Sequence, residues 1–267
     1  MKPLLTTYIV DAFTEKVFSG NPAAVCPLEK EWLPEQTMQQ LAAENNLAET
    51  AFFIPVENNQ FHIRWFTPTT EVKLCGHATL AAAHVLWNHL KYPHNTILFH
   101  SKSGILKATQ KDQRIWLDFP SDIPQPIEPP PYIAEALGFE PIAYYRSELN
   151  DMALLQSEAQ ITAIKPQLPL IAQIPKTGLI VTAKGDQVDF VSRYFAPQSG
   201  VNEDPVTGSA HSLLIPFWAA QLKNNNLIAQ QLSTRKGTLY CQLINEKRVL
   251  IGGNAVTYSI AQVINVE

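Results

Sequence analysis

The chain carries one segment pattern twice, and this repeat constrains its fold more than any other feature. In the first copy, Arg-Trp-Phe-Thr-Pro at positions 64–68 precedes Gly-His-Ala-Thr at 76–79 and an apolar run. In the second copy, Arg-Tyr-Phe-Ala-Pro at 193–197 precedes Gly-Ser-Ala-His at 208–211 and another apolar run. Each copy is typical of a strand, a loop broken by proline and a helix that begins at glycine. Because the copies lie about half a chain apart, we expect two similar lobes.

Two helices that begin at matching places suggest a binding site. Unpaired N–H groups and the positive end of the helix dipole lie at a helix N-terminus. Two such ends facing one another would bind an anionic ligand, such as a small carboxylate. The alternative is that two buried helices simply begin with glycine turns.

Composition narrows the class of protein. Hydrophobic residues make up 46% and charged residues 16%, as in globular proteins. The net charge is −4 and no more than two basic residues are adjacent, so no nucleic-acid partner is expected. No apolar stretch approaches the ~18 residues of a membrane span, and the N-terminus lacks a signal-peptide pattern. Three cysteines without metal-ligand spacing complete the expectation of a reduced, cytoplasmic protein without zinc.

Short strands are predicted in both halves of the chain, with one strongly apolar helix in each. The first helix should run from Gly76 to about Trp87, and the second from Thr207 to about Leu222. Pro216 should kink the second helix or shift its backbone hydrogen bonds. Residues 120–131 contain six prolines and predict a linker between the lobes. We therefore expect an α+β fold in which two sheets each curl around a central helix.

Glu49 and His77 interrupt apolar surroundings and are the first candidates for chemistry. Glu49 lies just before the hydrophobic residues 50–54, where burial would raise its pKa toward the range of a general acid or base. The alternative is a solvated carboxylate at a turn. His77 follows the first helix-leading glycine, where it would titrate near neutrality or donate to an anion. The alternative for His77 is a capping or core histidine.

Asp204 and Cys75 are further candidates at the two helix starts. Asp204 lies three residues before Thr207, where it would either take part in chemistry or cap the helix. His77 and Asp204 occupy matching parts of the two repeats, so a cleft between two lobes would bring them together. Cys75 directly precedes the first helix, whose dipole would stabilise a thiolate. A small buried hydrophobe is the alternative for Cys75.

Several stretches together resemble the phenazine-biosynthesis PhzF-like family, whose relatives include diaminopimelate epimerase. The Gly-His element at 76–77 and the Asp-Pro-x-Thr-Gly-Ser-Ala element at 204–210 are its most specific motifs. The matching stretches occur in the family's order at residues 11–13, 20–25, 46–52, 64–68, 75–80 and 203–210. They span most of the chain.

The resemblance implies a diaminopimelate-epimerase-like α+β fold. It has two pseudo-symmetric lobes, each a curled, mostly antiparallel sheet or barrel around a central α-helix, with the active-site cleft between them. In that fold the C-terminal strand crosses back to the first lobe. The lobes are therefore expected at 1–119 with about 255–267, and at 120–254. The resemblance also implies a homodimer without an organic or metal cofactor.

By the same resemblance, Glu49 looks like the family's acid/base. In the phenazine enzyme this group relays a proton between carbons of a dihydroxylated or amino-hydroxy cyclohexadiene carboxylate. His77 and Asp204 look like its polar companions. The residues expected to bind the substrate are Gly76, Gly208, Ser209 and Asn21.

The epimerase branch of the superfamily offers an alternative. Those enzymes use two cysteines, one from each repeat, on opposite faces of an α-carbon. This chain has Cys75 in the first repeat but Asp204-Pro205 in the second, so a one-carboxyl proton shift through Glu49 fits better. Two other interpretations stay open: an epimerase or racemase that pairs Cys75 with a non-cysteine partner, and a non-catalytic metabolite-binding protein.

Overall fold

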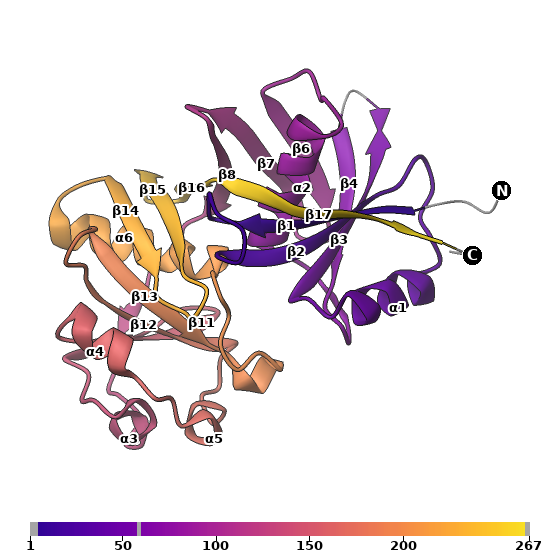
Figure 1. The fold of residues 1–267 in the computed structure, drawn as a ribbon. Coiled ribbons are helices and arrows are strands. Elements are labelled where there is room, and N and C mark those ends of the chain that lie inside the picture. The colour runs from indigo at the N-terminus through magenta and orange to yellow at the C-terminus, as the bar shows by residue number, and fades with distance from the viewer. Residues whose placement is uncertain (1–4, 58–59, 265–267) are drawn as a thin grey trace. The chain divides into compact units, whose positions relative to one another are not determined.

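In the computed structural model, which describes residues 5–57 and 60–264, the chain divides into two units. The first unit comprises the described residues of Met1–Asp118 and Gly252–Glu267, and the second comprises Phe119–Ile251. Each unit contains one long apolar helix and a set of short strands (Figure 1). Among the described residues, no helix is both long and apolar enough to cross a membrane.

The first unit is a mostly antiparallel arrangement of strands with two helices. Its strands are β1 (Leu5–Ala12), β2 (Asn21–Pro27), β3 (Glu49–Val56), β4 (Gln60–Phe66), β5 (Glu71–Val72), β6 (Thr96–Ser101), β7 (Gly104–Lys111), β8 (Arg114–Pro120) and β17 (Ala255–Val263). Its helices are α1 (Glu35–Asn45) and α2 (Gly76–Asn88). The antiparallel pairs are β17–β1, β1–β2, β3–β4, β4–β5, β6–β7 and β7–β8. The pairs β2–β3 and β4–β6 are parallel.

Helix α2 forms the centre of the first unit, as its apolar sequence predicts. Residues 76–83 and 85–87 are all buried, because β1, β2, β3 and β17 surround the helix. Helix α1 packs elsewhere on β3 and β4 through a separate apolar cluster that includes Met38, Phe52 and Phe66. Strand β3 is consequently buried at five consecutive residues, 50–54, as expected when both faces of a strand are covered.

The second unit contains the strands β9 (Gln125–Pro126), β10 (Ala143–Arg146), β11 (Asn150–Leu154), β12 (Gly178–Lys184), β13 (Phe190–Phe195), β14 (Asn226–Gln231), β15 (Gly237–Asn245) and most of β16 (Arg248–Gly253), whose last two residues belong to the first unit. Its helices are α3 (Ile133–Leu137), α4 (Glu158–Ala163), α5 (Leu168–Ile171), the 3-10 turn η2 (Pro197–Ser199) and α6 (Gly208–Leu222). Neighbouring strands pair in order from β9 to β15, with β11–β12 and β13–β14 parallel and the others antiparallel.

Helix α6 is the counterpart of α2. Its Trp218 ring stacks on Phe190 of β13 with centroids 5.7 Å apart, and the indole N–H donates to Thr182 Oγ1 of β12 at 3.0 Å. A second apolar cluster joins the short helices α3, α4 and α5 to β12 and β13. The sheet of this unit is therefore packed on both faces, which explains the unbroken burial of residues 178–183.

Pro216 does not interrupt α6, which is continuous from Gly208 to Leu222. The expected shift of backbone hydrogen bonds is present, because proline has no N–H to donate to the carbonyl of Ser212 four residues earlier. That carbonyl instead accepts the backbone N–H of Asp122 at 3.0 Å. The proline thus allows the helix to anchor the proline-rich segment that precedes α3.

Candidate active site

Two elements of the first unit bring the predicted acid/base and its histidine together. Glu49 is the first residue of β3, and His77 is the second residue of α2. Strand β2 runs parallel to β3, with Ala23 opposite Glu49, so Asn21 lies at the same end of the strand pair. Gly20 leads into Asn21 with φ +66°, and a Cβ there would lie 2.1 Å from the carbonyl oxygen of Ala12. Only glycine fits this turn without displacing its neighbours.

The imidazole of His77 is the centre of the resulting cluster. Its Nε2 lies 3.2 Å from Oε2 of Glu49. Its Nδ1 lies 3.2 Å from the side-chain nitrogen of Asn21 and 3.5 Å from Sγ of Cys75. One ring nitrogen therefore faces the carboxyl group, and the other faces an amide and a thiol.

Burial decides the charge of His77. The side chain is 5% exposed, and desolvation lowers its pKa to about 3, so the imidazole is neutral at pH 7. The expectation that His77 titrates near neutrality is therefore wrong. The amide of Asn21 donates to Nδ1, so the single ring proton lies on Nε2 and faces Glu49. This N–H is not aligned for a hydrogen bond to Oε2, and Nε2 has no aligned partner among the described residues.

Glu49, Cys75 and His77 are also ligand types that bind metals. One donor atom from each lies within 4.8 Å of the other two. However, Cys75 lies next to Nδ1 and Glu49 lies next to Nε2, on opposite nitrogens of one ring. A tetrahedral zinc site requires all donors at about 2.0–2.3 Å from one point. In these contacts, the thiol and the carboxylate face different nitrogens of the ring, an arrangement that also suits proton transfer.

Asp204 lies in the second unit, in the loop before α6. Its Oδ2 accepts the hydroxyl of Thr207 at 2.6 Å, and its backbone N–H donates to the carbonyl of Tyr194 at 3.1 Å. The N-cap of α6 is Thr207, which makes no side-chain capping bond. The interpretation of Asp204 as the helix cap is therefore wrong, and its carboxylate is held by Thr207 outside the helix.

The remaining predicted residues divide between the two units. Gly76 begins α2 and Gly208 begins α6, as the repeat predicts. Gly208 is buried and Ser209 is half-buried. The structure gathers Asn21, Glu49, Cys75, Gly76 and His77 in the first unit. Asp204, Gly208 and Ser209 belong to the second.

Two residues that hold Asp204 are Thr207 and Gln231, and sequence reasoning missed both in this role. The side-chain nitrogen of Gln231 donates to the Asp204 carbonyl at 2.8 Å and to Thr207 Oγ1 at 3.1 Å. Its side-chain oxygen accepts the Thr207 backbone N–H at 2.8 Å. The spacing of Asp204 and Thr207 is a signal for a side-chain hydrogen bond across a turn. Gln231 lies on β14, which the sequence did not predict, and no pattern points to it.

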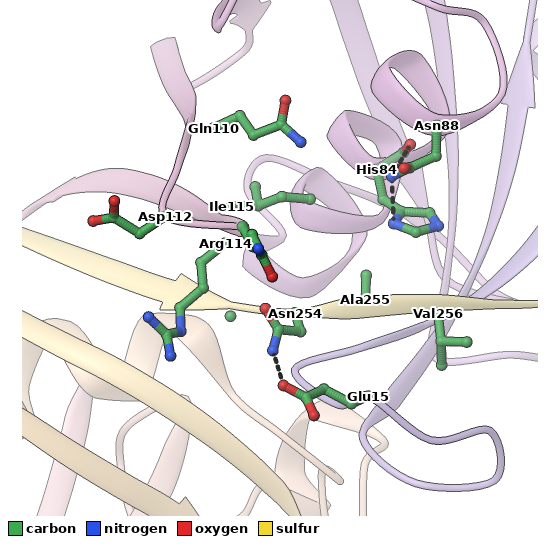
Figure 2. A pocket seen from close by; sticks show the side chains of 12 residues that line it. Glu15, His84, Asn88, Gln110, Asp112, Arg114, Ile115, Asn254, Ala255 and Val256 are labelled. Carbon is green, nitrogen blue, oxygen red and sulfur yellow. Dashed lines mark hydrogen bonds between the residues drawn. The ribbon is translucent and has the colours of Figure 1, made fainter.

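A separate cavity of about 500 Å³ lies in the first unit and contains none of the predicted site residues (Figure 2). Residues of α2, the β7–β8 turn and the start of β17 line it, and Glu15 is hydrogen-bonded to Asn254 at its rim (Figure 2). Burial, together with the neighbouring His89, lowers the pKa of its His84 to about 4. The lining is mainly amide and charged side chains.

Comparison with known proteins places this arrangement in a family. The profile of the family described as "Phenazine biosynthesis-like protein" matches residues 10–261. An uncharacterised isomerase of Pseudomonas aeruginosa is 49% identical over 247 residues, covering 92% of this chain and 94% of that protein. Both matches span nearly the whole chain.

Comparison with solved structures supports the same family and fold. A PhzF-family phenazine biosynthesis protein of Enterococcus faecalis aligns with a TM-score of 0.94 at 44% identity, covering 98% of this chain and 100% of the other. A hydroxyproline epimerase from Agrobacterium vitis has the same fold at 11% identity, with a TM-score of 0.63 and coverage of 100% and 95%. The expected epimerase-like α+β fold is confirmed. The chain belongs to the phenazine biosynthesis-like PhzF family and is an isomerase.

Proposed function

We propose that this isomerase moves a proton within a small carboxylate-bearing substrate, with Glu49 as the single acid/base and without a cofactor. The observation that carries the proposal is the 3.2 Å contact between Glu49 and a neutral, deeply buried His77. Because the buried imidazole is neutral, it has no acidic proton to transfer to the Glu49 carboxylate. Glu49 can then act as a base toward a substrate C–H.

The proposed reaction has two proton transfers. The Glu49 carboxylate removes a proton from one substrate carbon, and the C–H electron pair delocalises into the adjacent unsaturated or carboxylate-bearing system. The resulting carboxylic acid returns the same proton to another carbon on the same face. Atoms and charge balance without a second base. The side chain of Glu49 is 18% exposed, which keeps bulk water largely away from the transferred proton.

The cysteines support one carboxyl base over two thiols. Burial raises the pKa of Cys26 to about 12, and burial also raises the pKa of Cys241. Cys26 lies in the cluster under α1, and Cys241 lies on β15. Neither thiol is available as a thiolate partner for Cys75.

We propose that Asp204 and the N-termini of α2 and α6 contact the polar groups of the substrate. Asp204 would act with His77 to polarise the substrate. Gly76, Gly208 and Ser209 would supply N–H and hydroxyl donors to the carboxylate, because helix N-termini favour anions. Asn21 would act through Nδ1 of His77, since its amide fixes the proton of the ring on Nε2.

The test is the Glu49→Gln variant assayed in D₂O against a panel of small unsaturated and hydroxylated carboxylates. NMR would follow both the loss of each substrate and the position of any deuterium. We expect a substrate of the wild type to be bound but not turned over by Glu49→Gln. Exposed Glu44→Gln on α1 is the matched control and should retain full activity. Turnover by Glu49→Gln comparable to wild type would refute the role of Glu49.

One observation favours a second candidate, an epimerase in which Cys75 is a base. Its Sγ lies 3.5 Å from Nδ1 of His77, close enough for a proton to pass to the ring. In this case Cys75→Ser would abolish deuterium incorporation at the α-carbon, whereas Glu49→Gln would not. If Glu49 is the base, Cys75→Ser retains most of the turnover.

A further inference from the structure

The repeated arginine makes the same pair of contacts in both units. Arg64 donates through Nε and Nη2 to the two carboxylate oxygens of Glu71, each at 2.8 Å. Arg193 donates through Nε and Nη2 to the two carboxylate oxygens of Glu203, at 2.7 and 3.0 Å. Both are bidentate, charge-assisted pairs, the strongest hydrogen-bond geometry between side chains.

The repeated phenylalanine supports each arginine in the same way. Phe66 and Phe195 each lie two residues after the arginine on a strand. In each unit, the arginine and phenylalanine side chains therefore point to the same face of the strand. The Arg64 guanidinium lies 5.1 Å from the Phe66 ring centroid, and Arg193 lies 4.9 Å from that of Phe195. Both rings are buried. Each guanidinium is thus fixed against the core before it contacts its glutamate.

The glutamates lie on the segments that lead into the central helices. Glu71 is on β5, four residues before Cys75 and six before His77. Glu203 directly precedes Asp204, whose N–H is itself bonded to the carbonyl of Tyr194 beside Arg193. In each unit, the arginine on the strand therefore holds the segment that carries a candidate active-site residue.

We propose that Arg64–Glu71 and Arg193–Glu203 are matched clamps that position Cys75–His77 and Asp204 for the reaction. The four residues are positioning residues and act through the loops that they hold. This inference rests on the proposed function, since it presumes that His77 and Asp204 serve turnover.

The two clamps differ in the further partners that hold each arginine and glutamate. Arg64 also pairs with Glu35 of α1 at 2.6 Å, and Glu71 also binds Lys102. Arg193 donates in addition to the carbonyls of Ile161 and Ile164 at the end of α4, at 3.2 and 2.9 Å. Loss of either glutamate therefore frees one loop, while the arginine that bound it keeps a second partner.

The first experiment compares Glu203→Gln with Asp151→Asn in the full-length protein. Asp151 is the matched control, because Arg146 binds it in the same bidentate way at 2.7 Å for both bonds. It lies on β11, where Arg146 and Tyr144 bind its carboxylate. Hydrogen exchange of the Asp204 amide measures how firmly the loop is held, independently of catalysis. The kinetic constants kcat and KM measure whether that positioning affects turnover. Exchange and kinetics are measured at temperatures at which circular dichroism shows each variant to be fully folded.

We expect Glu203→Gln to speed exchange of the Asp204 amide about tenfold and to lower kcat by roughly 10- to 100-fold, with KM little changed. Asp151→Asn should lower the melting temperature at least as much and leave both readouts at the wild-type level. Arg193→Lys keeps the charge but not the bidentate geometry. Its amide exchange rate and its kcat should lie between those of Glu203→Gln and the wild type. Unchanged exchange in Glu203→Gln overturns the clamp, and faster exchange with unchanged kcat overturns its role in positioning.

The second experiment uses the two acidic partners of one arginine. Glu35 and Glu71 both bind Arg64, but only Glu71 lies on the segment before α2. Glu71→Gln should lower kcat several-fold, and Glu35→Gln should leave it unchanged. Equal effects would overturn the proposal for the first unit. If Glu49→Gln remains active, the proposed function fails, while amide exchange still tests the clamp itself.

Discussion

His211 offers a quantitative test of burial in the second unit, because its charge state is tied to the folded structure. The side chain is fully buried on α6, and its Nδ1–H donates to the Thr207 carbonyl at 2.8 Å. Desolvation lowers its pKa from the ordinary 6.5 to about 4, although the bond to Thr207 opposes part of that shift. The folded protein therefore keeps His211 neutral at a pH where the unfolded chain protonates it.

The sign and size of the effect follow from this difference. Between pH 6.5 and about 4 the unfolded state binds the additional proton, so stability is complete above pH 6.5 and is lost as the pH falls. Integration of a shift from 6.5 to about 4 gives a loss of about 2 kcal/mol at about pH 5. His77 and His84 are shifted in the same direction by burial, so the wild type will lose more than His211 alone explains.

The perturbation that isolates His211 is His211→Asn, whose side-chain amide can still donate to Thr207 but does not titrate. The free energy of unfolding is measured in urea by circular dichroism at about pH 8 and about pH 5, for variant and wild type. The variant should lose about 2 kcal/mol less than the wild type between these pH values. Exposed His94→Asn is the control and should follow the wild type. Equal losses for His211→Asn and the wild type would refute the reasoning.

Two further predictions concern the residues that support the site. Gly20→Ala should lower the melting temperature measured by circular dichroism, because left-handed backbone costs about 1–2 kcal/mol and the new Cβ meets the Ala12 carbonyl. Gly104 has φ +98° but open space around it, so Gly104→Ala should lower the melting temperature less. Equal decreases in the two variants would contradict the close-contact argument. Thr207→Val should lower kcat several-fold, because it removes the hydroxyl bound to Asp204. Thr207→Ser keeps a hydroxyl and should retain the wild-type kcat. An unchanged kcat in Thr207→Val would count against a role for that bond.

The elements that the sequence predicts are those with strong local signals. Helices α2 and α6 begin at the expected glycines, because long apolar runs after a glycine turn leave few alternatives. Helices α4 and α5 were not predicted. They are six and four residues long; α4 packs against β12 and β13, and α5 packs against α3 and η2. Short helices derive most of their stability from tertiary contacts, which no local pattern records.

The candidate site shows the same division between residue identity and environment. Motifs indicate Asn21, Glu49 and His77, but their contacts depend on the parallel register of β2 with β3. The neutral state of His77 follows from burial among distant segments, and sequence reasoning therefore assigned it the wrong titration range. Glu71 and Glu203 follow their arginines by 7 and 10 residues, so the repeat does not align them and the pairing becomes visible only in three dimensions.

The pairing of β17 with β1 has a consequence for biosynthesis. Leu5 pairs with Val263 and Ala12 with Ala255, so the partner of β1 leaves the ribosome only after the second unit, Phe119–Ile251, has been made (Figure 1). The second unit is in effect inserted within the first, and it can finish folding while β1 still has an open edge. Such an edge is a template for pairing with other chains. Synthesis that stops before Ala255 would leave a complete second unit attached to an aggregation-prone first one.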